Sequence, residues 1–262
     1  MKKKMLNTTK NNLITYGMVI IAYIIVQIFV LSGSLSNLMQ GLLVPLCTYV
    51  ILALSLNLTV GVLGELSLGH AGFMCIGAFT GAFFSKCTFG AIPDGLRFFL
   101  AILLGALVAA IFGILIGIPV LRLRGDYLAI VTLAFGEIIK NVMNVLYVGK
   151  DSAGFHFSLK DQMSLNLADG GEVIIKGAQG ISGTPKNSTF TIGIILVLIT
   201  LFIILNLMNS RDGRAVMAIR DNRIAAESIG INITKYKLMA FAVSASLAGV
   251  AGVLYALSLI HI

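Results

Sequence analysis

Long apolar runs constrain this chain more than any other feature of its sequence. Several reach the ~20 residues that a helix needs to cross a bilayer, and they are continuous rather than alternating, which favours helices over a β-barrel. The sequence is only 11% charged, whereas a soluble domain carries about 25% charged residues. We therefore predict an all-α fold, a single polytopic membrane helix bundle over residues 1–262. About seven spans are expected: Leu13–Leu31, Leu42–Val60, His70–Phe84, Phe98–Ile118, Tyr127–Tyr147, Phe190–Met208 and Leu238–Leu257.

Lysine and arginine are distributed unevenly between the predicted loops. With a cytoplasmic N-terminus, the lysine-rich start of the chain, the short loop 121–127 and the charged stretch 211–237 all lie inside, as the positive-inside rule favours. Membrane topology thus explains the net charge of +8, and we expect contact with membrane lipid and no nucleic acid partner. The longest polar stretch, residues 149–189, falls outside. It is either a docking surface for a delivery protein or a flexible linker.

The charged stretch Arg211–Lys237 stands between two very apolar spans. We expect a helix over residues 211–230, with Asp212 as N-cap and Gly230 as a left-handed C-terminal cap. One stripe of small apolar residues, broken by Asn222, recurs at helical spacing: Ala215, Ala218, Ile219, Ala225, Ala226 and Ile229. The charged residues fall mostly off that stripe: Arg214, Arg220, Asp221, Arg223 and Glu227. A face without Trp, Phe or Leu anchors weakly in lipid, so the helix either docks on a soluble partner or stays solvated.

Glycines interrupt the apolar sequence at Gly61–Gly72, GVLGELSLGHAG. Such a density of glycine weakens a continuous helix. Broken backbone at membrane depth is tolerated where it is buried in protein or lines a wet cavity, and it often marks substrate sites in transporters. The candidate pathway residues in this segment are Glu65, Ser67, Gly69 and His70. The alternative is a short turn near the inner face, with Glu65 and His70 in water.

The fifth predicted span contains Glu137 in the sequence TLAFGEIIK. An ionisable residue inside a span is a functional candidate by default, so Glu137 joins the candidate pathway residues. The alternative is a pair with Lys140 or Asn141, one helical turn away and close to the outer face.

Small residues recur at a spacing of four in several predicted spans. This spacing lets helix backbones approach closely, so it predicts tight helix–helix interfaces. The pairs are Gly77/Gly81, Ala78/Ala82, Gly105/Ala109, Gly113/Gly117, Ala245/Gly249 and Ala248/Gly252.

Sequence motifs for catalysis and for metal or nucleotide binding are missing. The sequence has no Walker A pattern, no H-E-x-x-H, no G-x-S-x-G and no CxxC. The histidines His70, His156 and His261 are far apart, and the three cysteines match no zinc spacing. We therefore expect no enzyme activity, no catalytic or metal-binding residues and no cofactor bound by this chain.

Four sequence blocks together resemble the LivM-type permease of branched-chain amino-acid ABC transporters. They are GELSLGHAGFMCIGAF, GDYLAIVTLAFGEIIK, GAQGISGTP and the long block that runs from GRAVMAIRDN to GVLYA. The resemblance covers about Leu42 to Tyr255. Permeases of this family continue well past the GVLYA block, whereas this sequence stops soon after it, so we expect an incomplete C-terminus.

The resemblance implies a permease subunit of an importer for Leu, Ile or Val in the inner membrane of a bacterium or archaeon. It implies a second homologous permease, two cytoplasmic ATP-binding subunits that use the ATP, and an extracytoplasmic substrate-binding protein. The segment Gly213–Gly230 matches the family's contact with the ATPase, which favours partner docking over a solvated loop. Related urea and amide permeases share these blocks, so such an importer is an alternative, as is an ATP-independent channel.

Overall fold

The computed structural model describes residues 2–90, 92–123, 125–151, 154–165, 172–181, 183–184 and 188–258, without the side chains of residues 2–9 and 172. Arg124 of the predicted inner loop and residues 259–262 at the chain end lie outside this description. The long helices are α1 (Lys2–Leu31), α2 (Asn37–Asn57), α3 (His70–Cys87), α4 (Asp94–Val120), α5 (Asp126–Val145), α6 (Phe190–Asn209) and α9 (Ile233–Ala256). The shorter elements are the π-helix η1 (Leu58–Leu63), α7 (Arg211–Asp221), α8 (Arg223–Ser228), the strands β1 (Tyr147–Asp151), β2 (Gly154–Ser158) and β3 (Glu172–Lys176), and the 3-10 turns η2 (Met163–Leu165) and η3 (Gly177–Gln179).

The predicted all-α membrane bundle is confirmed. Six helices of the described residues are long and apolar enough to cross a membrane, where about seven spans were expected. The difference is α3, which has 18 residues and fills the position of the third predicted span. It begins at His70, packs against α4 and α9, and buries Phe73, Ile76 and Ala82.

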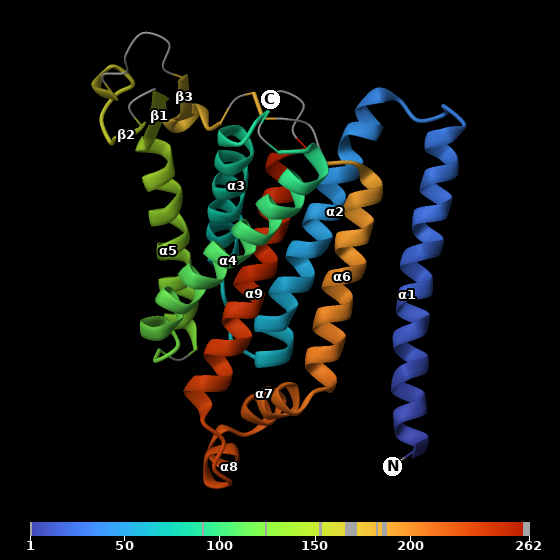
Figure 1. Cartoon of the computed structure of the whole chain (residues 1–262). Helices are drawn as coiled ribbons and strands as arrows, with labels where there is room; N and C mark the ends of the chain where they lie inside the picture. The colour runs from blue at the N-terminus through green and yellow to red at the C-terminus, as the bar shows by residue number, and fades with distance from the viewer. Residues whose placement is uncertain are drawn as a thin grey trace.

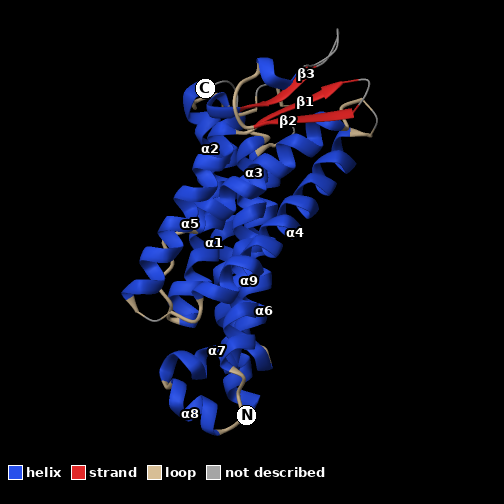
Figure 2. Cartoon of the chain, turned by 90° about the vertical axis from the view of Figure 1, so that its left-hand side faces the viewer, coloured by secondary structure: helices blue, strands red, loops and turns tan. Residues whose placement is uncertain are grey.

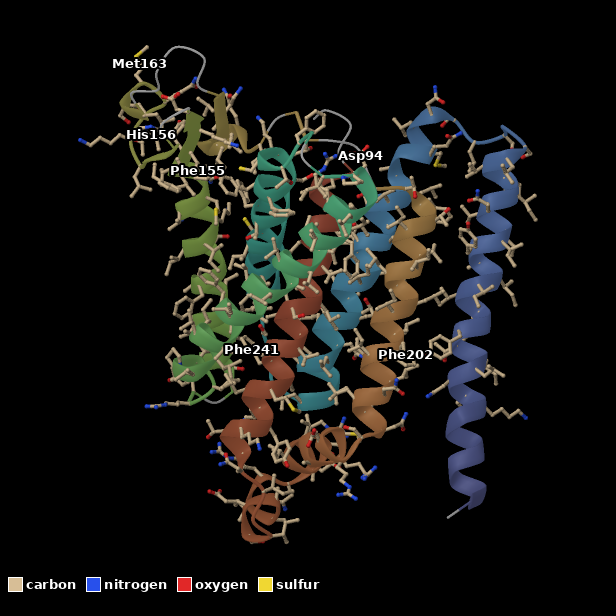
Figure 3. All side chains as sticks on the ribbon, viewed as in Figure 1. Asp94, Phe155, His156, Met163, Phe202 and Phe241 are labelled. Atoms are coloured by element: carbon tan, nitrogen blue, oxygen red, sulfur yellow. The ribbon has the colours of Figure 1, made fainter. Side chains whose placement is uncertain are left out.

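Helix α9 forms the centre of the bundle, and α1 stands at its edge (Figure 1). Of the most apolar 18-residue stretch of each helix, 61% is buried in α9 and none is buried in α1. The Tyr23 hydroxyl of α1 lies 3.1 Å from the Thr191 hydroxyl of α6. Below this bond, Phe202 of α6 projects toward α1 and lines an apolar groove with Tyr16 and Ile20 (Figure 3).

Glycine contacts hold α3, α4 and α9 together, as the spacing of small residues predicts. A Cβ atom at Gly77 of α3 would lie 2.5 Å from the Cα of Gly249 in α9. One at Gly113 of α4 would lie 2.6 Å from the Cβ of Ala245. A Cβ at Gly252 would collide with the backbone carbonyl of Met74. Three helix backbones thus meet at distances that only glycine and alanine permit.

The polar stretch after α5 contains a three-stranded antiparallel sheet in the order β2-β1-β3, so a flexible linker is the wrong interpretation. Val148 of β1 pairs with Phe157 of β2 and with Ile175 of β3. Val148, Ile174 and Ile175 are buried against Phe79 and Phe83 of α3. Turns follow β3 in the sequence block GAQGISGTP, with positive φ at glycines 177, 180 and 183; Ser182 and Pro185 of that block lie outside the described residues.

The sheet lies at one end of the bundle, and α7 and α8 lie at the other (Figure 2). We call these the sheet end and the α7–α8 end. Helix α9 starts beside α8 and runs to the sheet end (Figure 1).

Candidate functional site

The predicted break in the helical backbone is present at Gly61–Gly72. Helix α2 continues into the π-helix η1, which ends at Gly64 with φ of +77°. The next five residues have no regular structure, and α3 begins at His70. Only glycine adopts the left-handed backbone at position 64 without strain, so Gly64 turns the chain out of η1. We call Gly64–Gly69 the re-entrant segment.

The re-entrant segment runs along α9 toward the middle of that helix. Glu65 forms an ion pair with Lys237, in the second turn of α9. His70 Nε2 lies 2.7 Å from Ser244 Oγ, about two turns further along the helix. Ser244 is at the midpoint of a helix that is long enough to span the bilayer. Non-helical backbone at this depth must be enclosed by protein or line a wet cavity.

The interpretation of this segment as a solvated turn is wrong. The His70 residue is 5% exposed and Ser67 is 2% exposed. The Glu65 side chain is 17% exposed and lies against the Lys237 side chain, which is 6% exposed. The polar side chains of the segment are therefore packed into the bundle, and the charge of Glu65 is neutralised by Lys237 of α9.

A chain of hydrogen bonds connects the start of α3 with α9 and α2. The Ser244 hydroxyl donates to the backbone carbonyl of Ser55 in α2. Because the hydroxyl proton of Ser244 already forms that bond, His70 donates from Nε2 to Ser244 Oγ. Nδ1 of His70 is then left as an acceptor. His70 Nδ1 and Ser67 Oγ are both buried and have no hydrogen-bond partner among the described residues. Buried polar atoms without partners are costly, so these two atoms mark places for water or a polar solute.

Helix α5 covers the other side of the re-entrant segment. The Leu68 amide donates to Thr132 Oγ1 at 3.0 Å. A side chain at Gly69 would collide with the Thr132 carbonyl, and a Cβ at Gly72 would lie 3.0 Å from the Cα of Gly136. Gly69 therefore allows the close approach of two backbones.

Glu137 is not brought together with Glu65, Ser67, Gly69 and His70. It lies on an exposed face of α5, where its carboxylate accepts a hydrogen bond of 3.2 Å from Lys140. The two side chains are 56% and 62% exposed. The pairing expected as an alternative is therefore present, and a transport role for Glu137 stays a prediction.

The charged stretch after α6 forms two helices instead of one. Asn222 is extended, ends α7, and caps α8 by accepting the Ala225 amide at 3.1 Å. The prediction of Asp212 as N-cap is wrong, because Ser210 accepts the Gly213 amide at 3.0 Å and Asp212 lies in the first turn. The left-handed cap at Gly230 is confirmed by its φ of +86°.

Helix α7 packs against the end of α2 and the start of α9. Val216 of α7 is 1% exposed and belongs to a buried apolar cluster with Leu58, Val62 and Leu63 of η1 and Ala240 of α9. Ile219 is buried with Ala226 of α8 and Ile233 of α9. Part of the predicted stripe thus faces the bundle of the chain itself.

Arg220 connects α7 to the entrance of the re-entrant segment. Its guanidinium donates to the Gly61 carbonyl at 2.8 Å and to the Asp221 carboxylate at 3.0 Å. A Cβ at Gly64 would lie 2.6 Å from the Arg220 side chain. Arg220 and Asp221 were predicted to contact a partner; the structure shows contacts within the chain.

The outward side of this end carries apolar and charged groups. Ile224 and Ile229 are 81% and 75% exposed. Arg214 is exposed and donates to the Asn209 carbonyl at 2.9 Å, Glu227 is exposed, and Arg223 is partly exposed. Figure 3 shows many nitrogen-bearing side chains around α7. We call Ile224 and Ile229 the α8 tip.

Four residues of these sites were not predicted: Thr132, Ile224, Lys237 and Ser244. Ser244 lies inside the last predicted span and Lys237 directly before it, which is a signal that could have revealed these two, because polar residues inside spans usually face protein.

The family described as "Branched-chain amino acid transport system / permease component" matches residues 38–262. The high-affinity branched-chain amino acid transport system permease proteins LivM of Salmonella typhimurium and Escherichia coli are 39% and 37% identical over 217 residues. These alignments cover 79% of this chain and 50% of each relative. The nucleoside ABC transporter permease protein NupC of Lactococcus lactis is 26% identical over 195 residues, which cover 74% of this chain and 59% of NupC. No solved structure matches.

The chain spans about half the length of the LivM relatives that it matches. The family match covers every described element from α2 to α9, including the re-entrant segment and the α7–α8 end. The chain therefore belongs to the permease component family of branched-chain amino acid transport systems.

Proposed function

We propose that this chain is a permease subunit of an ATP-driven importer for Leu, Ile and Val in the inner membrane. Its family and its identity with two LivM proteins support this assignment. The partners would be a second homologous permease, two ATP-binding subunits and an extracytoplasmic binding protein. The bias of Lys and Arg supports a cytoplasmic N-terminus and a cytoplasmic α7–α8 end.

The observation that supports the coupling function best is the construction of the α7–α8 end. Helix α7 is fixed to η1 and α9 through buried Val216 and through the bond from Arg220 to the Gly61 carbonyl. The α8 tip exposes two large apolar side chains next to charged groups. Apolar anchors surrounded by polar residues are typical of a protein interface. The α8 tip would bind the ATPase, and α7 would transmit its movement.

The proposed mechanism passes from α7 to the re-entrant segment. When the two ATP-binding subunits close on nucleotide, they would push α7. Through the bond from Arg220, α7 would then pull on the Gly61 carbonyl near the end of η1. The Glu65–Lys237 pair and the bond from His70 to Ser244 hold the segment that follows. Exchange of these contacts would let α2 and the re-entrant segment shift against the α3–α9 pair, which alternates access to the pathway.

Substitutions at the α8 tip test the docking assignment. Ile224→Asp and Ile229→Asp should each weaken co-purification with the ATPase about thirty-fold, since a charged group in the centre of an interface costs ~2 kcal/mol or more. Ile224→Leu is the matched control, because it keeps the apolar volume. Retained ATPase binding by both Asp variants, with the chain folded in the membrane, would contradict the assignment.

Nucleosides are a second candidate substrate class because of the identity with NupC. Uptake of labelled leucine and labelled uridine by the reconstituted importer distinguishes the two classes. We expect uptake of leucine and none of uridine.

A further inference from the structure

Helix α5 exposes a polar stripe in the half of the helix that is nearer the sheet end. Glu137, Lys140, Asn141 and Asn144 follow the spacing i, i+3, i+4 and i+7, so they share one face of the helix. All four are exposed, and Glu137 bonds to Lys140 at 3.2 Å. Below the stripe, the same face continues with the exposed apolar residues Ile130 and Leu133.

The other described spans present different surfaces. The exposed side chains in the middle of α4 include Leu103, Leu107 and Leu115, and α6 exposes Ile195, Ile199 and Phe202. Among the described parts of the six candidate spans, α5 is the one that exposes charged side chains more than one turn from both of its ends. Arg97 of α4 and Lys237 of α9 are buried.

Lipid is an unsuitable environment for this stripe. A Glu or Lys costs about 3 kcal/mol in the middle of a membrane helix, and the stripe has one of each together with two asparagines. The sheet does not cover Glu137 and Lys140, because both side chains are more than half exposed. The stripe therefore requires water or polar partner groups beside it in the assembled protein.

We propose that this face of α5 lines the water-filled outer vestibule of the transport pathway, with a homologous permease chain forming the opposite wall. The proposal rests on the proposed transport function. Glu137 and Lys140 together carry no net charge, so the stripe has no preference for an ion of one sign. One acid and one base a helical turn apart match the ammonium and carboxylate groups of an amino acid zwitterion. Ile130 and Leu133 would mark the apolar inner limit of the vestibule.

Labelling of single cysteines tests whether water reaches the stripe. Asn141→Cys and Asn144→Cys are made in a chain whose cysteines at 47, 75 and 87 are replaced by alanine, and Leu107→Cys on α4 is the lipid-facing control. In the assembled transporter, a membrane-impermeant thiosulfonate should modify both α5 positions at least about ten-fold faster than position 107, since thiolate forms in water and not in hydrocarbon. Equal, slow modification at all three positions would overturn the proposal.

The role of the charges is tested by leucine uptake at varied concentration. Glu137→Gln should raise the half-saturating leucine concentration about ten-fold, the size expected for one lost hydrogen bond to a charged group. Leu107→Met on α4, which lies outside the stripe and keeps an apolar side chain there, is the control. An unchanged value for Glu137→Gln would overturn the zwitterion assignment. The labelling result does not depend on the α8 tip, so failure of the docking assignment and failure of the vestibule are distinguishable.

Discussion

The two halves of the bundle are held together by different kinds of contact. From Ser244 toward the sheet end, α3, α4 and α9 meet through Gly77, Gly105, Gly249 and Gly252, with backbone against backbone. From Ser244 toward the α7–α8 end, α2 gives way to η1 and the re-entrant segment. There polar contacts join the elements beside the apolar cluster around Val216: Glu65 with Lys237, His70 with Ser244, and Arg220 with the Gly61 carbonyl.

This difference indicates which half can change its shape. Close-packed backbones have few alternative arrangements, because any displacement opens voids or creates overlap. Directional polar contacts can be exchanged one for another when a helix moves by a turn or less. We therefore expect the glycine-packed half to move as a rigid body and the polar half to act as the hinge driven by α7.

The largest effect is expected in the glycine-packed half. Gly252→Ala places a methyl group against the Met74 carbonyl and the Ala78 amide nitrogen, which are both backbone groups of α3. We expect a loss of at least about 3 kcal/mol in stability, at the upper end of overpacking penalties. The measurement is the thermal unfolding midpoint of the purified chain in detergent. Gly41→Ala in α2 is the control, because it has nothing within 4 Å of the added Cβ; equal midpoints for the two variants would contradict the proposed rigidity.

A smaller effect is expected at the ion pair in the polar half. Lys237→Met leaves the carboxylate of Glu65 unpaired and 17% exposed. Removal of one partner from a fully buried pair costs about 3–5 kcal/mol, and this partly open site should lose less than that, about 2 kcal/mol. The double variant Glu65→Gln with Lys237→Met removes both charges, so it should recover part of the loss. Additive losses in the unfolding midpoints would argue against a direct pair.

The sequence predicted the features that depend on local pattern. The length of the apolar runs predicted the positions of the long helices. The spacing of small residues predicted tight helix–helix interfaces, and the contact of Gly77 with Gly249 is one of them. The density of glycine predicted the break at Gly61–Gly72. In each case the physical cause lies within about twenty neighbouring residues, the length of one span.

The features that the sequence did not reveal depend on distant partners or on close competitors. Glu65 and Lys237 are 172 positions apart, so the pattern could not distinguish a buried pair from two solvated charges. Ser and Asp both cap helices well, so Ser210 and Asp212 were both possible caps. Ser210 is the cap because it directly follows the end of α6, and α7 begins after it. The strands β1, β2 and β3 have five residues each, too short to stand out in a polar stretch.

The most direct test of the hinge is the number of leucine molecules imported for each ATP hydrolysed after Arg220→Ala. In proteoliposomes with the assembled transporter, we predict that the ATPase still binds and hydrolyses ATP, since the α8 tip is unchanged. Import per ATP should fall about ten-fold, because α7 loses its charged hydrogen bond to the Gly61 carbonyl. Lys235→Ala, at an exposed position of the same end, should leave the ratio as it is. An Arg220→Ala transporter with the ratio of the unaltered protein would contradict the account.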